Sequence, residues 1–372
     1  MTRPFSLYLD LLRVLAAFTV LLSHFAYERF TDGSYLFIRE LNLGSDAVVL
    51  FFVLSGLVIA YAAEEKDGGP GRFFFNRATR MYSVAIPALL IGFVLDRSGA
   101  FVNPEAYAGW WYNPLNLSQN LFYGLTFSSE WGVVWGVRLG SNGPYWSLSY
   151  EVAYYLIFGA AIFLDGVKRV LAITVLCAVV GLNVLLLMPI WLMGVWLWNL
   201  IKAGEVSLNR AAAWALAVGP VMVYSLCLAL GLPGALLAGM GAITGLEADT
   251  YRAVTRFSDE FIWNTLVGLL ATAHLMGIWA LAKSWQLSGG AAQRAIRWLA
   301  GASFSLYLVH YPVLQFADAA LPLGPVGPLR DVALLAVVIA ACLLFARWFE
   351  RPLPQFRRAV KGLYARLAPQ AA

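Results

Sequence analysis

The chain has 372 residues, of which 60% are hydrophobic and only 13% are charged, with a formal net charge of +5. Soluble domains carry about 25% charged residues, whereas this sequence repeats apolar runs of the ~20 residues that cross a bilayer. The composition therefore excludes an ordinary soluble domain, and the lack of alternating ten-residue segments excludes a transmembrane β-barrel. We predict an all-α, polytopic membrane protein whose surroundings are the lipid bilayer, with no nucleic-acid partner.

Ten apolar segments are long enough to be membrane spans. In chain order they cover residues 6–26, 46–63, 81–95, 145–164, 170–183, 185–201, 211–231, 261–282, 302–320 and 329–347. The uncharged stretch 170–201 is too long for one ordinary span and short for two, with Asn183 and Pro189 as candidate turn or kink points.

Charge orients these spans. With ten spans and a cytoplasmic N-terminus, most Lys and Arg residues fall on the inner side and most Asp and Glu residues on the outer side, as the positive-inside rule requires. A single span over 170–201 would place the basic segment "RPLPQFRRAVKGLYAR" outside. We therefore predict ten spans with both termini cytoplasmic. Residues 1–372 are expected to form one integral-membrane domain with no separate soluble domain.

The first segment, "LDLLRVLAAFTVLLSHF", carries charged and polar side chains that a bilayer disfavours. Arg13 and His24 are eleven residues apart, so they lie about 20° from one line and ~16 Å apart along a helix. Asp10 precedes Arg13 by three residues and can pair with it. Intramembrane charges commonly mark functional sites. Taken singly, Arg13 also fits a side chain that reaches the inner interface, and His24 one at the outer interface.

Glu151 stands in the apolar segment "WSLSYEVAYYL", at a depth similar to that of His24. A His24–Glu151 pair could remove a proton from a hydroxyl, with the carboxylate fixing the imidazole tautomer. The alternative for Glu151 is a structural hydrogen-bond hub. In "SFSLYLVHYPV", His310 could join Ser305 and Tyr307 in a buried network facing the same cavity, or could be purely structural.

On the inner side, "FNRATRMYS" places Arg77 and Arg80 three residues apart at the start of the third span. Such a pair can bind phosphate, and together with Arg13 it would form a basic funnel for a large anionic cofactor. Each arginine alone also fits an ordinary inner-side anchor. No metal is expected, because the three histidines lie on different helices without ligand spacing.

The longest predicted non-helical stretch, residues 97–143, lies on the outer side. It contains Trp110, Trp111, Trp131 and Trp135 together with several asparagines. Interfacial aromatic belts have this composition, and so does a platform for a polyhydroxylated acceptor such as a sugar. Both interpretations remain open from the sequence.

Six motifs in order resemble the membrane acyltransferase-3 family over almost the whole chain. They are the Arg-x10-His spacing of the first segment, "GSDAVVLFFVLSGLVIA", "RATRMYSVAIP", "WSLSYEVAYYL", "SFSLYLVHYPV" and "FERPLP". One departure is Leu-Arg-Val around Arg13, where many members have Gly-Leu-Arg-Gly.

The resemblance implies a bacterial inner-membrane O-acyltransferase. It would transfer an acyl group, expected to be acetyl, from cytoplasmic acyl-CoA to a hydroxyl of an extracytoplasmic glycan or lipid-linked sugar. His24 and Glu151 would be catalytic, and Arg13, Arg77 and Arg80 would bind the donor. The substrate pocket is expected to include Asp10, Asp46, Trp146, Ser149, Tyr307 and His310.

Two other classes fit ten spans with polar residues inside. A transporter or flippase would line a path with its charges and commonly contains inverted repeats, of which the sequence shows none. A non-catalytic membrane scaffold on the same fold would tolerate loss of His24. Acyl-CoA turnover distinguishes the enzyme from both alternatives.

Overall fold

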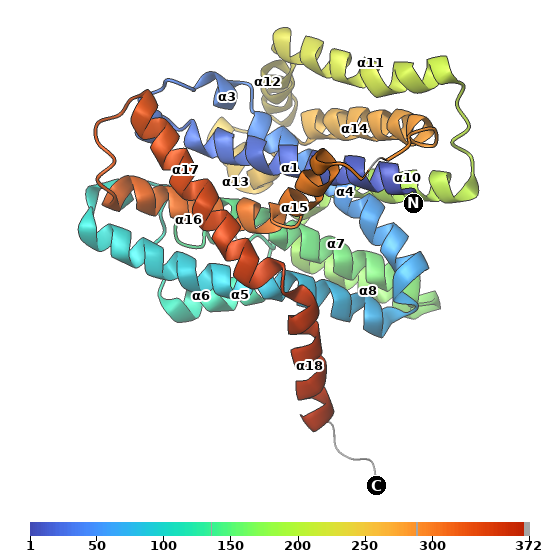
Figure 1. Cartoon of the computed structure of the whole chain (residues 1–372), viewed down its shortest axis with the longest axis horizontal. Coiled ribbons are helices and arrows are strands. Elements are labelled where there is room, and N and C mark those ends of the chain that lie inside the picture. Colours follow the sequence, from blue (N-terminus) through green and yellow to red (C-terminus); the bar gives the residue numbers. More distant parts are fainter. Residues whose placement is uncertain (135, 288, 368–372) are drawn as a thin grey trace.

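The computed structural model describes residues 1–134, 136–287 and 289–367, and these ranges contain helices but no β-structure beyond isolated bridges (Figure 1). The helices are α1 (Arg3–Phe25), α2 (Glu28–Thr31), α3 (Phe37–Glu40), α4 (Leu43–Ala62), α5 (Pro70–Val102), α6 (Leu117–Leu125), α7 (Trp146–Phe163), α8 (Gly166–Val180), α9 (Leu182–Leu186), α10 (Met188–Ala203), α11 (Arg210–Ala229), α12 (Leu232–Thr244), α13 (Ala248–Thr255), α14 (Phe261–Ala282), α15 (Ala291–Ala300), α16 (Ser303–Ala320), α17 (Pro328–Phe345) and α18 (Leu353–Leu367).

Each of the ten predicted spans overlaps at least one helix, although 170–183 includes the break at Gly181 and 185–201 includes the break at Leu187. Seven helical stretches of the described chain are long and apolar enough to cross a membrane, which makes this a multi-pass membrane protein. The predicted spans at 145–164, 170–183 and 302–320 correspond to the shorter helices α7, α8 and α16. The third predicted span is part of α5, which has 33 residues and is therefore ~50 Å long.

The uncharged stretch 170–201 is not one continuous helix. Gly181, with a φ of +85°, separates α8 from α9, and α10 begins after Leu187. Pro189 lies at the first turn of α10, where a missing N–H leaves no hydrogen bond unmade, so it does not kink the helix. Asn183 donates from its side chain to the backbone carbonyl of Glu130 at 2.8 Å. The helix is therefore interrupted at Gly181, and the hydrogen bond of the buried Asn183 amide holds the interruption in place.

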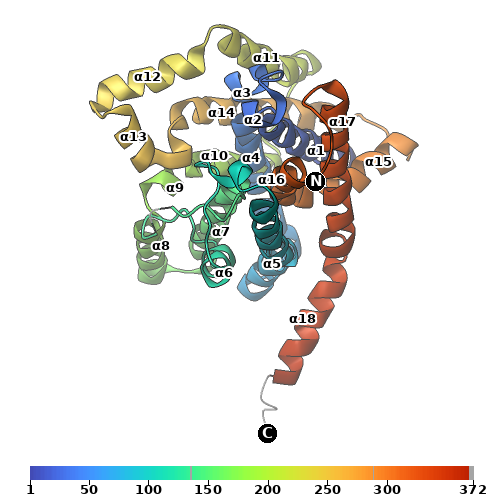
Figure 2. The same ribbon diagram turned by 90° about the vertical axis from the view of Figure 1, so that its left-hand side faces the viewer.

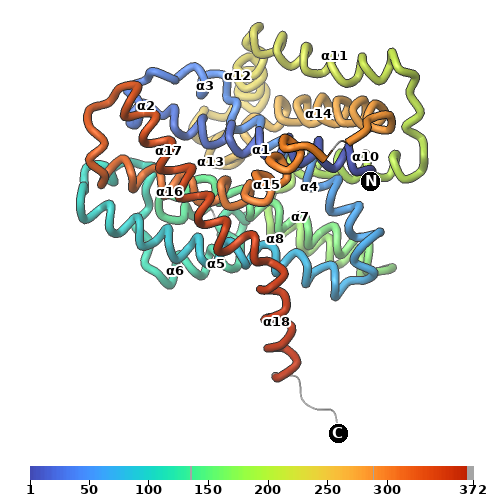
Figure 3. The backbone as a smooth tube through the Cα atoms, viewed as in Figure 1, coloured from blue at the N-terminus to red at the C-terminus, as the bar shows by residue number. Residues whose placement is uncertain are grey.

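The helices pack around α4 and α16. Helix α4 contacts α1, α10 and α14, while α16 lies between α1, α5 and α17 (Figure 2). A Cβ on Gly56 would clash with the carbonyl oxygen of Trp191, and one on Gly194 with that of Val53. These two glycines let α4 and α10 approach closely, as small residues do between membrane helices. Helix α18 projects from the bundle and carries the C-terminal end of the described chain (Figure 3).

Candidate active site

A cavity of about 360 Å³ lies among α1, α4, α5, α7 and α16. Its wall includes the predicted site residues Arg13, Arg80, Glu151 and Tyr307. The Arg13 guanidinium lies 3.4 Å from an Asp10 carboxylate oxygen, which confirms the predicted pair. The other Asp10 oxygen accepts from an Arg297 guanidinium at 3.0 Å, so this carboxylate also joins α1 to α15.

Arg80 is held at the cavity wall by Glu350. The Arg80 guanidinium donates to one carboxylate oxygen of Glu350 at 2.8 Å, and the backbone N–H of Ser305 donates to the other at 2.8 Å. Glu350 is buried and ends a π-helical turn, Ala346–Glu350, after α17. The "FERPLP" motif thus supplies the carboxylate that links three segments beside the cavity.

Arg77 is not on the cavity wall, contrary to the prediction that it acts beside Arg80. Its side chain is buried, ion-paired with Asp67, and donates to the Phe73 carbonyl at 2.8 Å. A π-helical turn at Ala63–Asp67, after α4, brings the Asp67 carboxylate to α5. Because that carboxylate and a backbone carbonyl occupy it, Arg77 joins α4 to α5 instead of facing a ligand.

Glu151 faces the cavity but does not pair with His24. Its carboxylate accepts hydrogen bonds from the Ser55 hydroxyl at 2.7 Å and from the Tyr155 hydroxyl. The predicted His24–Glu151 pair is therefore wrong. Similar depth in the bilayer does not fix the direction of a side chain, and α7 turns Glu151 toward α4.

The partner of His24 is His310. The Nδ1 atom of His24 lies 2.9 Å from the Val20 carbonyl oxygen and 3.1 Å from Nε2 of His310. The Nδ1 atom of His310 lies 2.8 Å from the Leu306 carbonyl oxygen. Carbonyl oxygens only accept, so each neutral imidazole is assigned its proton on Nδ1. Nε2 of His24 consequently keeps its lone pair, as a general base requires.

This histidine pair lies close to the cavity along α16. Tyr307, on the cavity wall, precedes His310 by less than one helical turn, or ~4.5 Å of rise. The Tyr307 hydroxyl lies 2.6 Å from the Ser147 hydroxyl and donates to the Pro144 carbonyl at 3.1 Å. The Ser305 hydroxyl makes no hydrogen bond among the described residues. His310 therefore contacts His24, and not the predicted hydroxyls of Ser305 and Tyr307.

Of the six predicted pocket residues, only Tyr307 lines the central cavity. Asp10 and His310 lie outside it in the contacts described above, and the other three lie outside it as well. Asp46 is buried and accepts from Tyr224 and the Trp263 indole, each at 2.8 Å. Ser149 is buried 2.9 Å from the Ser129 hydroxyl. Trp146 stacks on Phe257 with ring centroids 4.5 Å apart and lines a separate cavity of about 70 Å³. In the structure these three side chains make contacts within the protein. A sequence motif by itself does not distinguish a residue that packs between helices from one that contacts substrate.

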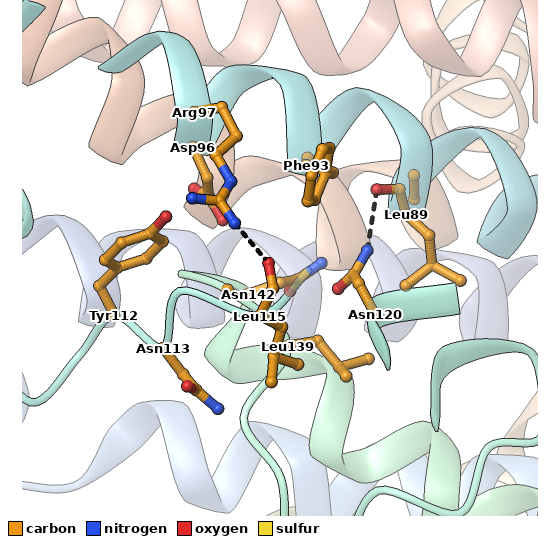
Figure 4. Close-up of a pocket in the computed structure, with 13 residues that line it drawn as sticks. Leu89, Phe93, Asp96, Arg97, Tyr112, Asn113, Leu115, Asn120, Leu139 and Asn142 are labelled. Carbon is orange, nitrogen blue, oxygen red and sulfur yellow. Dashed lines mark hydrogen bonds between the residues drawn. The ribbon is translucent and has the colours of Figure 1, made fainter. Parts of the chain in front are cut away.

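The stretch 97–143, predicted to be non-helical, begins inside α5 and contains α6, so the prediction is wrong for these residues. The loop segments that follow α5 are tied back to it around a small pocket (Figure 4). Asp96 accepts from the backbone N–H and the hydroxyl of Ser141, and Arg97 donates to the Leu115 carbonyl at 2.8 Å. The pocket holds about 10 Å³, roughly the space of one water molecule, so it is a joint between segments rather than a substrate site. Trp135 lies outside the described residues.

Several residues at the two ends of this site were assigned no role from the sequence. Ser55 and Tyr155 hold Glu151, and the Tyr311 ring lies 4.8 Å from that of His24. Ser55 and Tyr311 belong to the motif segments "FFVLSG" and "VHYPV". Their place in these motifs was the sequence feature that could have indicated a role. Within the described residues, no group of three or more His, Cys, Asp or Glu side chains could hold a metal ion.

A family model described as an acyltransferase domain, acyltransferase-3, matches residues 6–347. The chain belongs to this family. It is 26% identical over 359 residues to acyltransferase MdmB of Streptomyces mycarofaciens, a match that covers 92% of this chain and 89% of the relative. It is 28% identical over 158 residues to an O-acetyl transferase of Shigella phage Sf6, covering 41% and 45% respectively. No solved structure matches the chain. The acyltransferase-3 protein described here is an O-acyltransferase.

Proposed function

We propose that the protein transfers an acyl group, acetyl above all, from cytoplasmic acyl-CoA to a hydroxyl of an extracytoplasmic carbohydrate. It would do so in the bacterial inner membrane, as ten spans with both termini inside. The observation that carries the proposal is the contact of Nδ1 of His24 with the Val20 carbonyl and with His310, close to a cavity with two arginines. The lone pair assigned to Nε2 of His24 follows from that contact. The printed name of the phage relative, an O-acetyl transferase, supports acetyl as the group.

The cavity supplies the donor side of this proposal. Coenzyme A is anionic and too polar to cross a bilayer, and Arg13 and Arg80 offer it positive charge. The ~16 Å of α1 between Arg13 and His24 is comparable to an extended pantetheine arm. Glu151, held by Ser55, would be a fixed acceptor that orients the N–H groups of that arm. We assign Arg77 no donor contact in this proposal, because it is ion-paired with Asp67.

The histidine pair supplies the chemistry. Nε2 of His24 takes the acceptor's hydroxyl proton while the oxygen attacks the thioester carbonyl carbon. The carbon–sulfur bond then breaks, and the departing coenzyme A thiolate takes this proton from Nε2 of His24. In between, His24 is an imidazolium whose Nδ1–H is shared between the Val20 carbonyl oxygen and Nε2 of His310, and these two acceptors stabilise the positive charge.

The first test uses the purified protein in lipid nanodiscs with radiolabelled acetyl-CoA and a cell-envelope glycan extract. We expect His24→Ala to lose about 10²–10⁴-fold in rate, the usual worth of a general base. His310→Gln should lower kcat less, because its amide oxygen can still accept from His24, and should leave the KM for acetyl-CoA unchanged. Glu151→Gln should mainly raise that KM.

His274→Gln is the matched control, since the His274 ring bonds to the Tyr8 hydroxyl and the Ala217 carbonyl and lies outside the proposed site. It should retain transfer. A His24→Ala protein as active as the native one would overturn the mechanism. Acetyl-CoA binding without transfer by any form would favour the scaffold, and movement of a glycan across vesicles without turnover would favour the transporter.

A further inference from the structure

Two arginines gather at the outer end of α1 around the ring of Tyr27. The guanidinium carbon of Arg39 lies 3.6 Å from the Tyr27 ring centroid, and that of Arg29 lies 4.4 Å from it. The Arg29 guanidinium also lies 4.5 Å from the Trp111 ring. Stacking on aromatic faces fixes the direction of each guanidinium while leaving N–H donors available.

These arginines are attached to the neighbours of His24. Arg39 donates to the carbonyl of Ser23 at 3.1 Å, and Arg29 donates to the Tyr311 hydroxyl. The rings of Tyr27 and Tyr311 lie 6.1 Å and 4.8 Å from the His24 ring. The cationic groups are therefore one side chain away from the proposed base.

A third arginine approaches from the loop before α7. Arg138 lies 5.3 Å from the Trp110 ring, and a Cβ on Gly143 would sit 2.9 Å from an Arg138 nitrogen and 4.0 Å from the Tyr311 ring. Arg138 thus lies close to Tyr311, the residue to which Arg29 is hydrogen-bonded. We call Tyr27, Arg29, Arg39, Arg138 and Tyr311 the outer cluster.

No carboxylate within the described residues neutralises the outer cluster at ion-pair distance. None of its arginines has a carboxylate oxygen within 4.0 Å. The nearby carboxylates are engaged elsewhere, because Asp318 pairs with Arg330, and Glu130, across the small cavity from Arg138, pairs with Arg256 at 2.9 Å. The acidic residues of the same outer segment, Glu28, Asp32 and Glu40, are exposed.

Leaving these cations unneutralised needs a reason. In the proposed topology this is the outer side, where the sequence otherwise concentrates acidic residues. In addition, Nε of Arg29 is buried without a hydrogen-bond partner. Guanidinium groups match carboxylate and phosphate oxygens by paired hydrogen bonds. A bound anion would satisfy these donors and balance the charge.

We propose that the outer cluster binds an anionic group, a carboxylate or a phosphate, on the carbohydrate acceptor and so holds a neighbouring hydroxyl at Nε2 of His24. The inference rests on the proposed function and narrows its acceptor to an acidic carbohydrate. Arg39 is a binding residue for that group, and Arg29 both binds it and positions Tyr311 beside His24.

The test compares two acceptors in nanodiscs with labelled acetyl-CoA: octyl β-D-glucuronide and octyl β-D-xyloside. The two have the same ring hydroxyls and differ only in the carboxylate. We expect a KM at least about tenfold lower for the glucuronide, the scale of charge-assisted hydrogen bonds. Added salt should reduce the difference. In parallel, an envelope extract separated by anion exchange should take label in its anionic glycan fraction.

Variants of Arg39 isolate the subsite. Arg39→Gln should raise the KM for the glucuronide about tenfold while the KM values for the xyloside and for acetyl-CoA stay unchanged, and Arg39→Lys should restore part of the loss. Arg252→Gln is the matched control, because Arg252 is an exposed arginine of α13 with only a 3.8 Å contact to Asp259. It should behave as the native protein.

The outcomes separate this inference from the function on which it rests. Label that enters neutral glycans as well as acidic ones, or an Arg39→Gln effect that is equal for both octyl glycosides, overturns the acidic-acceptor inference and leaves acyl transfer intact. No transfer to any acceptor overturns both. The KM for the glucuronide is also compared in nanodiscs with and without phosphatidylglycerol. If this lipid competes with the glucuronide, the outer cluster binds a lipid phosphate instead of the acceptor.

Discussion

At the residue scale, the geometry of His24 depends on backbone carbonyls and a second imidazole rather than on a carboxylate. The Val20 and Leu306 carbonyls fix where the protons lie, and the 3.1 Å contact to His310 gives the cation a neutral acceptor. Glu151 lies on the wall of the donor cavity instead. Because His24 and Glu151 do not pair, His24 is free to act on the acceptor hydroxyl and Glu151 is free to contact the acyl donor.

Glu130 offers a pH-dependent test at the same scale. It lies in the loop before α7, and burial raises its pKa from 4.5 to about 7, against the opposing attraction of Arg256 and Arg138. The folded protein therefore holds this proton more tightly than the unfolded chain does. The stability it contributes is complete below about pH 4.5 and is lost as pH rises through about 7.

We expect the unfolding temperature of the native protein in nanodiscs to fall as pH rises from about 5 to 7.5, and Glu130→Gln to flatten this slope. Light scattering or tryptophan fluorescence during heating measures both. Glu105→Gln, at an exposed position between α5 and α6, is the control and should keep the native slope. Identical slopes for native protein and Glu130→Gln would contradict the prediction.

At the element scale, α4 connects the proposed donor and base regions through side chains and close packing. Ser55 donates to Glu151, the next residue, Gly56, lets α10 approach, and a Cβ on Gly44 would clash with the hydroxyl of Ser23, beside His24. The second-helix motif therefore combines one hydrogen-bond donor with two positions where only hydrogen fits. This explains the motif physically without giving every member a catalytic role.

Gly56→Ala tests the packing of α4 on α10. The added methyl would meet the backbone carbonyl of Trp191, which cannot rotate away, so the helices must separate. We expect a loss of about 1–3 kcal/mol, the usual cost of overpacking, seen as a lower unfolding temperature in detergent. Gly219→Ala in α11, where a Cβ has open space, should be neutral or slightly stabilising. Equal stability of the two variants would disprove the close approach.

At the scale of the whole molecule, the helices divide the site between two regions along α1 and α16. Arg13 and Tyr307 line the cavity, whereas His24 and His310 lie farther along the same helices. A donor and an acceptor that never share a compartment could then meet within the bundle. This arrangement depends on the proposed orientation of the spans, which labelling can test directly.

In a variant whose three cysteines are replaced by alanine, single cysteines at Glu105 and Lys361 report the two sides. We expect a membrane-impermeant maleimide to label Glu105→Cys in intact spheroplasts and Lys361→Cys only after lysis. Positive-inside charge and ten spans together require this pattern. Labelling of Lys361→Cys in intact cells would place α18 outside and exclude the even number of spans.

The sequence by itself determined the helical membrane class, the approximate positions of the long apolar helices, the Asp10–Arg13 pair and the family, because hydropathy, i,i+3 spacing and motif order are local properties. Only the tertiary structure decided that His24 meets His310, 286 positions away, and that Arg77 is occupied by Asp67. A sequence gives the depth of a side chain in a span. The direction in which it points depends on packing between helices distant in the chain.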